Sequence, residues 1–430
     1  MTQAANSSGP PSGTPAEILT EASAAKNGDV QALLKHPPFQ SFWSARILST
    51  LAVQIQTVAV GWQVYDLTRS AFALGMIGLV QFAPAILLTL VVGQVADRYN
   101  RRWIIRICQT LACCIALILA IGSYQGWLTD QIIFALVFVF GIARAFEAPS
   151  NSALLPQLVP PGLFARAISL SSASQQATII AGPALGGFIY AAGPTASYGT
   201  CAVLFLLASL LIATIRIAAP VAAREPVDMQ SLFAGFSFIR NQPVVLGAIS
   251  LDMFAVLLGG ATALLPIYAR EILHTGPWGL GLLRSAPAIG ALAMSIYLAR
   301  RPLERNAGRA MFIGVAVFGV ATIVFALSSS VVLSLCALVL LGAADMISVV
   351  IRSALVQLET PDAMRGRVSA VNWLFIGTSN QLGEFESGVT AALLGVVPAA
   401  LLGGVGTLLV AALWMRLFPA LLQRDRLVRG

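Results

Sequence analysis

Long apolar stretches separated by short polar segments dominate this chain. Between residues 39 and 419, twelve such stretches are close to the roughly 20 residues that a membrane-spanning helix needs. Because lipid cannot satisfy the backbone groups of an open strand edge, runs of this length are expected to be helices. The predicted spans are residues 40–65, 72–96, 103–125, 131–154, 164–191, 196–217, 243–269, 277–299, 309–329, 331–355, 366–391 and 397–418.

The second six spans repeat the first six. The tetrapeptide Ala-Pro-Ala-Ile occupies residues 83–86 and again residues 286–289, and the same offset pairs Tyr65 with Tyr268. Two membrane halves repeated in parallel are typical of one large group of secondary transporters. The pattern therefore predicts an all-α membrane protein, with twelve transmembrane helices in two pseudo-symmetric six-helix halves.

Five segments follow from this division. Residues 1–38 are rich in Ala, Ser, Gly and Pro and are expected to be a disordered cytoplasmic tail. Residues 39–218 and 243–418 form the two halves. Residues 219–242 form a cytoplasmic linker, in which apolar residues at helical spacing predict an amphipathic helix on the inner surface. Residues 419–430 form a basic cytoplasmic tail.

Composition agrees with lipid as the solvent. The chain is 57% hydrophobic and only 10% charged, whereas a soluble domain carries about 25% charge. Its mean hydropathy is +0.83. A soluble fold of this size could not bury so much apolar surface, so the lipid bilayer is an expected partner.

The net charge of +8 reports on topology. Arginines gather after every second span, at Arg98, Arg101, Arg102, Arg106, Arg166, Arg224, Arg240, Arg300, Arg301, Arg305, Arg309, Arg365, Arg367, Arg424, Arg426 and Arg429. The alternate loops hold only Arg69 and Arg270. The positive-inside rule then places both termini and the linker in the cytoplasm. This distribution argues against nucleic acid as a partner.

Residue patterns for enzymatic or metal chemistry are missing from the sequence. The five cysteines lie inside predicted spans without metal-ligand spacing. Nucleotide-binding glycine loops are also absent. The sequence predicts a protein that is not an enzyme and has neither a metal site nor a cofactor.

The loop after the second span carries a recognisable motif. Gly93, Asp97, Arg98, Arg101 and Arg102 have the spacing G-x-x-x-D-R-x-x-R-R, which resembles the signature of the major facilitator superfamily. Topology alone explains arginines in this loop, but not the glycine and aspartate at fixed offsets. The resemblance implies that this loop is a gating latch on the cytoplasmic side. Gly93 would allow close helix approach there.

Two further resemblances concern transport direction and branch. Residues 182–187, with Gly182, Pro183, Gly186 and Gly187, are similar to the superfamily's exporter motif, although Thr178 replaces its first glycine. Ordinary helix packing around a proline kink is the alternative. The sequences around Asp252 and Arg284, residues 360–370 and residues 380–388 resemble the enterobactin-exporter branch, which includes macrolide-efflux relatives. The resemblance implies a multi-pass protein of the bacterial cell (inner) membrane.

Ionisable residues inside spans are functional candidates, because charge at mid-bilayer is costly. Arg144, Glu147 and Asn151 share one helix face. Asp345, Ser348 and Arg352 repeat this spacing in the second half. Arg144 can pair with Glu147 on its own helix or with Asp345 across the halves. The acids are either proton-coupling groups or members of a structural ion-pair network.

Other polar residues complete the predicted transport path. Asp252 and Glu384 are further proton-coupling candidates, and Asp252 is the first choice of partner for Arg284. Ser49, Gln56 and Gln63 recur every seven residues and predict, with Asn151, a polar lining of the substrate cavity.

The sequence favours a proton-coupled secondary transporter that exports a siderophore-like or drug-like small molecule. Its partners would be that substrate and protons, and the protein is expected to be a monomer. An importer or lipid flippase of the same fold remains open, as does a non-transporting membrane sensor or scaffold.

Overall fold

The computed structural model describes residues 33, 35–216, 229–301, 303 and 305–425. All of its regular secondary structure in these ranges is helical. The first half contains α2 (Pro37–Thr68), α3 (Ala71–Leu87), α4 (Thr89–Arg98), α5 (Arg101–Gln125), α6 (Asp130–Leu158), η1 (Pro161–Leu163), α7 (Phe164–Tyr190) and α8 (Pro194–Thr214). The remainder contains α9 (Met229–Asn241), α10 (Pro243–Leu258), η2 (Ala261–Leu264), α11 (Leu265–Ile267), η3 (Tyr268–Ile272), α12 (Pro277–Arg300), α13 (Ala307–Leu327), α14 (Val331–Glu359), α15 (Asp362–Leu394), α16 (Val396–Leu417) and α17 (Pro419–Leu422).

The predicted spans lie largely in helices where the structure describes them, and the predicted all-α membrane fold is confirmed. Within the described residues, nine helical segments are long and apolar enough to cross a membrane. One of these is the interrupted segment Pro243–Ile272, in which α10 gives way to η2, α11 and the π-helical turn η3. The shorter α3 is apolar but has 17 residues, and it is separated from α4 at Leu88. The helices α7 and α15 are long but more polar.

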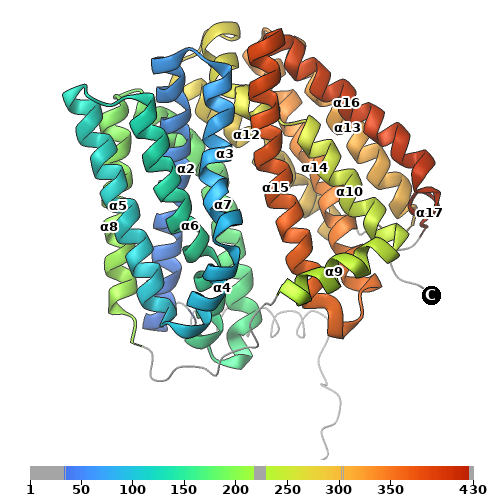
Figure 1. The fold of residues 1–430 in the computed structure, drawn as a ribbon, viewed down its shortest axis with the longest axis horizontal. Helices are drawn as coiled ribbons and strands as arrows, with labels where there is room; N and C mark the ends of the chain where they lie inside the picture. The colour runs from blue at the N-terminus through green and yellow to red at the C-terminus, as the bar shows by residue number, and fades with distance from the viewer. Residues whose placement is uncertain (1–32, 34, 217–228, 302, 304, 426–430) are drawn as a thin grey trace, which may run out of the picture.

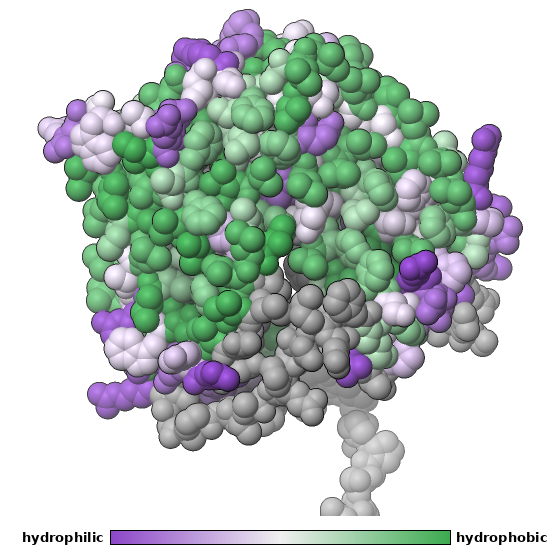
Figure 2. All heavy atoms as spheres, in the orientation of Figure 1, coloured by the Kyte–Doolittle hydropathy of each residue, from purple (hydrophilic) through white to green (hydrophobic). Residues whose placement is uncertain are grey.

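The helices form two groups that match the halves of the sequence (Figure 1). In the first group, α2 packs against α7 and α8, while α5 packs against α6 and α8. In the second group, α14 packs against α12 and α13, while α10 and α13 pack against α16. The surface around the helix bundle carries many exposed Leu, Ile, Val and Phe side chains, which give the apolar face seen in Figure 2. Lipid tails are the environment in which such a surface is stable.

The α9 helix lies within the predicted linker and packs on α15 and α10 at one end of the second group (Figure 1). Ile239 is buried there, and Phe236 contacts the ring of Phe375 at 6.4 Å between centroids. The end that holds α9 and the α4–α5 loop is called the inner end here, after the predicted topology. The opposite end, where α2 ends and α12 begins, is called the outer end.

The two groups of helices meet along α7 with α12 and along α3 with α15. The first contact depends on Gly187 and Gly281, whose backbones face one another. A Cβ atom added at Gly281 would lie only 2.5 Å from the carbonyl oxygen of Pro183, so any larger residue would separate the helices. On its other side, α7 packs against α2 through Gly182 and Gly186. Small residues permit this close approach in membrane proteins.

Polar contacts also join the halves at the outer end. The Tyr65 hydroxyl donates a hydrogen bond to Glu271, and Asp66 forms an ion pair with Arg270. The Arg270 guanidinium lies 5.7 Å from the centre of the Trp62 ring. The end of α2 and the turn η3 are thereby held together, and these four polar residues are called the outer seal.

Candidate transport site

In the first half, Glu147 is the centre of a buried hydrogen-bond network. Its carboxylate accepts hydrogen bonds from Ser49 on α2 at 3.0 Å and from Gln109 on α5 at 3.3 Å. Arg144 forms an ion pair with it at 2.9 Å on the same helix, α6. Of the two partners predicted for Arg144, the structure selects Glu147 and not Asp345. The network joins three helices, and its opposite charges balance.

In the second half, Asp252 on α10 pairs with Arg352 on α14. The carboxylate lies 3.3 Å from the guanidinium and accepts a hydrogen bond from Ser348 at 3.2 Å. Arg352 also donates to Asn372 on α15 at 3.0 Å. The predicted pairing of Asp252 with Arg284 is therefore wrong. The reason is helix packing, because α14 brings Arg352 against the buried face of α10.

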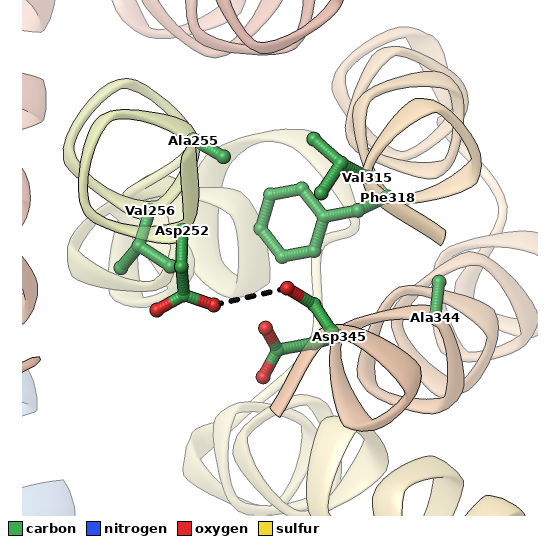
Figure 3. Close-up of a pocket in the computed structure, with 8 residues that line it drawn as sticks. Asp252, Ala255, Val256, Val315, Phe318, Ala344 and Asp345 are labelled. Carbon is green, nitrogen blue, oxygen red and sulfur yellow. Dashed lines mark hydrogen bonds between the residues drawn. The ribbon is translucent and has the colours of Figure 1, made fainter. Parts of the chain in front are cut away.

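A second carboxylate faces the same place. Asp345 and Asp252 both border a small cavity among α10, α13 and α14, whose wall also includes Phe318 (Figure 3). Ser348 is a further wall residue. The cavity measures about 10 Å³, which is close to the least room that one water molecule needs. Two acids thus border this cavity, and one of them, Asp252, is paired with the guanidinium of Arg352.

A larger cavity of about 220 Å³ lies between the two halves. Its wall comes from α2, α3, η2, α12 and α15, through Val53, Gln54, Thr57, Gly61, Leu74, Ile77, Gln81, Ala263, Arg284, Gln381 and Glu384. Two predicted site residues, Arg284 and Glu384, therefore share this cavity. The Nε atom of Arg284 is buried and has no hydrogen-bond partner among the described residues.

The polar stripe predicted on α2 faces the interior of the first half, which corrects the expectation that it lines the cavity. Ser49 binds Glu147, and Gln63 accepts a hydrogen bond from Tyr198 at 2.7 Å. Gln56 is also buried. The cavity instead receives Gln54, which lies on nearly the opposite side of α2 from Gln56, because two residues span about 200° of an α-helix. The fourth predicted lining residue, Asn151, belongs to neither cavity described above.

The motif loop makes its described contacts within the first half. Arg101 donates to the carbonyl oxygen of Ala153 at 3.2 Å. Arg102 donates through Nε to the carbonyl oxygen of Ile212 at 3.2 Å. Arg98, the last residue of α4, is exposed. These contacts connect the loop to α6 and α8, so neither arginine bridges the halves in this arrangement.

The other two motif positions predicted to form the latch are Gly93 and Asp97. A Cβ atom added at Gly93 would meet open space, so the close helix approach expected there is not present in this arrangement. The side chain of Asp97 lies outside the described part of the structure. Asn100 has a local role, because its side chain accepts a hydrogen bond from the backbone N–H of Arg102 and caps α5.

Sequence reasoning missed the outer seal and most of the cavity wall. The repeat did pair Tyr65 with Tyr268, and Arg270 was one of two arginines in the outer loops. Those two signals point to the region of the seal. Gln54, Gln81 and Gln381 gave no comparable signal, because uncharged amides are common in membrane helices that face one another.

Comparisons with known proteins place this arrangement in a family. Residues 30–426 match the transmembrane secretion effector family of the major facilitator superfamily. The enterobactin exporter EntS of Citrobacter koseri is 26% identical over 397 residues, which cover 91% of this chain and 94% of the relative. The uncharacterized MFS-type transporter YjbB of Bacillus subtilis is 26% identical over 410 residues, which cover 94% and 96%.

Solved structures agree on the fold. A point mutant of the nucleoside transporter NupG superposes with a TM-score of 0.72 at 14% identity, covering 88% of this chain and 99% of its own. A bacterial homologue of the lysosomal transporter Spinster, solved in an inward-facing and occupied conformation, gives 0.71 at 14% identity, covering 88% and 96%. The predicted superfamily, with its relation to enterobactin exporters, is confirmed, and its members are transporters and not enzymes. This chain belongs to the transmembrane secretion effector family of the major facilitator superfamily.

Proposed function

We propose that the protein is a proton-coupled exporter of a siderophore-like or drug-like small molecule across the bacterial inner membrane. The observation that carries the coupling is the charge imbalance between α10 and α14. Asp252 and Asp345 border one cavity, and Arg352 is the guanidinium paired there. Export as the direction is supported by the similarity to enterobactin exporters.

The imbalance creates a place for one proton. A single guanidinium can compensate only one of two carboxylates, and an uncompensated charge inside the membrane is costly. A proton on either acid would neutralise the remaining negative charge. The adjacent cavity has about the room for one water molecule, which would hydrate the acid that takes up the proton.

The pair in the first half has a different role. Glu147 already has a guanidinium and two hydrogen-bond donors, from Arg144, Gln109 and Ser49. Its charge is balanced without a proton. We therefore assign it to holding α2, α5 and α6 together while the halves move.

Alternating access follows from the contacts between the halves. In this structure, the outer end is closed by the outer seal and by the α7–α12 contact. Export requires those contacts to separate and the inner end to close. Protonation of the acids between α10 and α14 would change the pairing of Arg352, and so bias the balance between the two states.

The test is substrate-driven proton flux in proteoliposomes, with enterobactin and erythromycin as the probe substrates. Asp252→Asn and Asp345→Asn are each expected to abolish proton movement, while Glu147→Gln keeps coupling in whatever protein still folds. Asp252→Asn also removes the ion-pair partner that lies 3.3 Å from Arg352, and breaking a buried pair costs up to about 3–5 kcal/mol of stability. The double variant with Arg352→Met separates this effect, because it should recover the thermal midpoint without recovering coupling. Full coupling in both aspartate variants would refute the proton assignment.

Direction is tested separately. Everted vesicles that accumulate enterobactin when energised would support export. Accumulation only by right-side-out vesicles would indicate an importer, and movement of a fluorescent phospholipid between leaflets would indicate a flippase. No transport of any probe, with a folded protein, would favour a sensor or scaffold.

A further inference from the structure

The cavity between the halves contains a charged side chain whose hydrogen-bonding capacity is incompletely used. Arg284 projects from α12, and its buried Nε atom has no partner among the described residues. Leaving a buried donor unpaired is unfavourable, because its lost hydration is not replaced. Glu384 faces the same cavity from α15, but within the described residues its carboxylate and this guanidinium form no ion pair. The Nε–H group of Arg284 is therefore available to donate a hydrogen bond to an additional acceptor.

Both charged side chains reach across to the first half. A Cβ atom added at Gly61 on α2 would lie 3.9 Å from a terminal nitrogen of Arg284. At Gly78 on α3, an added Cβ atom would lie 2.7 Å from a carboxylate oxygen of Glu384. The two glycines thus leave room for the charges of the opposite half. Any movement of the halves changes the surroundings of both charges together.

We propose that this cavity binds an organic anion, a small molecule with a carboxylate or similar acidic group on an apolar body. Arg284 anchors the acidic group, because a guanidinium binds a planar carboxylate through two parallel hydrogen bonds. Gln54, Gln81 and Gln381 supply neutral hydrogen bonds around it. The apolar part of the wall, Val53, Leu74, Ile77 and Ala263, contacts the body of the ligand. The proposal rests on the transport function proposed above and specifies its substrate class.

The chemistry of the two charged groups favours an anion over a cation. Glu384 can lose its charge by taking a proton, whereas the guanidinium of Arg284 stays charged at any physiological pH. A bound anion with Glu384 protonated leaves the cavity neutral. A bound cation would instead leave two positive charges against one negative charge. The anion and the ionised Glu384 are therefore alternative compensating charges for Arg284 within one cavity.

The position of the cavity suits release toward the outer end. Gly61 lies on the wall and Asp66 of the outer seal follows five residues later, about 7.5 Å along α2. Separation of the outer seal would expose the cavity to that side. The proposed site is thus closed on the outer side by contacts already described.

The test measures binding to the purified full chain in detergent, without a gradient, using benzoate, benzamide and benzylamine as anionic, neutral and cationic probes. Benzoate is expected to raise the thermal midpoint at pH 6, and the other two are not. Arg284→Gln should weaken benzoate binding at least about tenfold, since hydrogen bonds to charged groups contribute about 1.5–3 kcal/mol. Glu384→Gln should strengthen benzoate binding at pH 7.5 and reduce its dependence on pH. Arg309→Gln, at an exposed arginine of α13, is the matched control and should bind like the wild type.

The Glu384→Gln arm keeps the proposal testable if Arg284→Gln folds poorly, because a misfolded protein does not bind more tightly. Equal shifts by the three probes, no shift with benzoate, or benzoate binding that survives Arg284→Gln would overturn the anion site. Uncoupled transport with intact Arg284-dependent binding would instead refute the proposed proton coupling and leave this site standing.

Discussion

Breaking the Asp66–Arg270 pair should open the outer end more often. The two side chains are about one-third exposed, at 34% and 29%. A fully exposed ion pair contributes about 0.2–1 kcal/mol, and a hydrogen bond to a charged group about 1.5–3 kcal/mol. An intermediate contribution of about 1–2 kcal/mol corresponds to a factor of about 5–30 in the ratio of open to closed states. Asp66→Asn should shift the ratio by this factor.

The measurement is the labelling rate of one cysteine at Thr57, which lines the cavity between the halves. It is introduced into a variant without the five native cysteines, and an impermeant thiol reagent is added from outside. While the outward-open state is rare, the labelling rate is proportional to its population. Asp66→Asn and Arg270→Gln should each raise the rate about 5–30-fold.

Charge exchange provides the decisive control. The double variant Asp66→Arg with Arg270→Asp restores the opposite charges and should return the labelling rate to near the wild-type value. Asp130→Asn, at the start of α6 on the same end, should leave it unchanged. An unaltered rate in Asp66→Asn would refute the seal. Raised rates in both single variants without recovery in the double variant would refute the pairing.

Three further outcomes are expected. A cysteine at Ser70 should react with an impermeant reagent from outside and one at Asn306 should not; the reverse pattern would invert the topology. Gly281→Ala places a Cβ atom 2.5 Å from the carbonyl oxygen of Pro183 and should raise labelling at the outer end by separating α7 from α12; a rate like that of the wild type would show that the helices adjust without parting. Asp97→Asn should leave membrane insertion normal and reduce transport of erythromycin strongly; wild-type transport at equal protein level would remove the latch role.

The spans could be predicted because apolar length is a local property of the chain. The partners of buried charges could not, because they depend on the rotation and depth of each packed helix. Asp252 illustrates this limit, since an adjacent span offered Arg284 while the packing of α14 supplied Arg352. The seven-residue spacing of Ser49 and Gln56 correctly indicated one face of α2, but spacing does not reveal which neighbour that face meets.

The contacts between the halves follow the repeat that is visible in the sequence. Gly78 on α3 and Gly281 on α12 occupy equivalent positions 203 residues apart, and each lies where its helix meets the other half. The two halves therefore meet through equivalent contacts used twice, as the subunits of a symmetric dimer do. Neither of these glycines lies in the linker. Two separately expressed halves would thus retain the surfaces through which they associate in the bilayer. Cutting the linker would then convert the single chain into a heterodimer of its two halves.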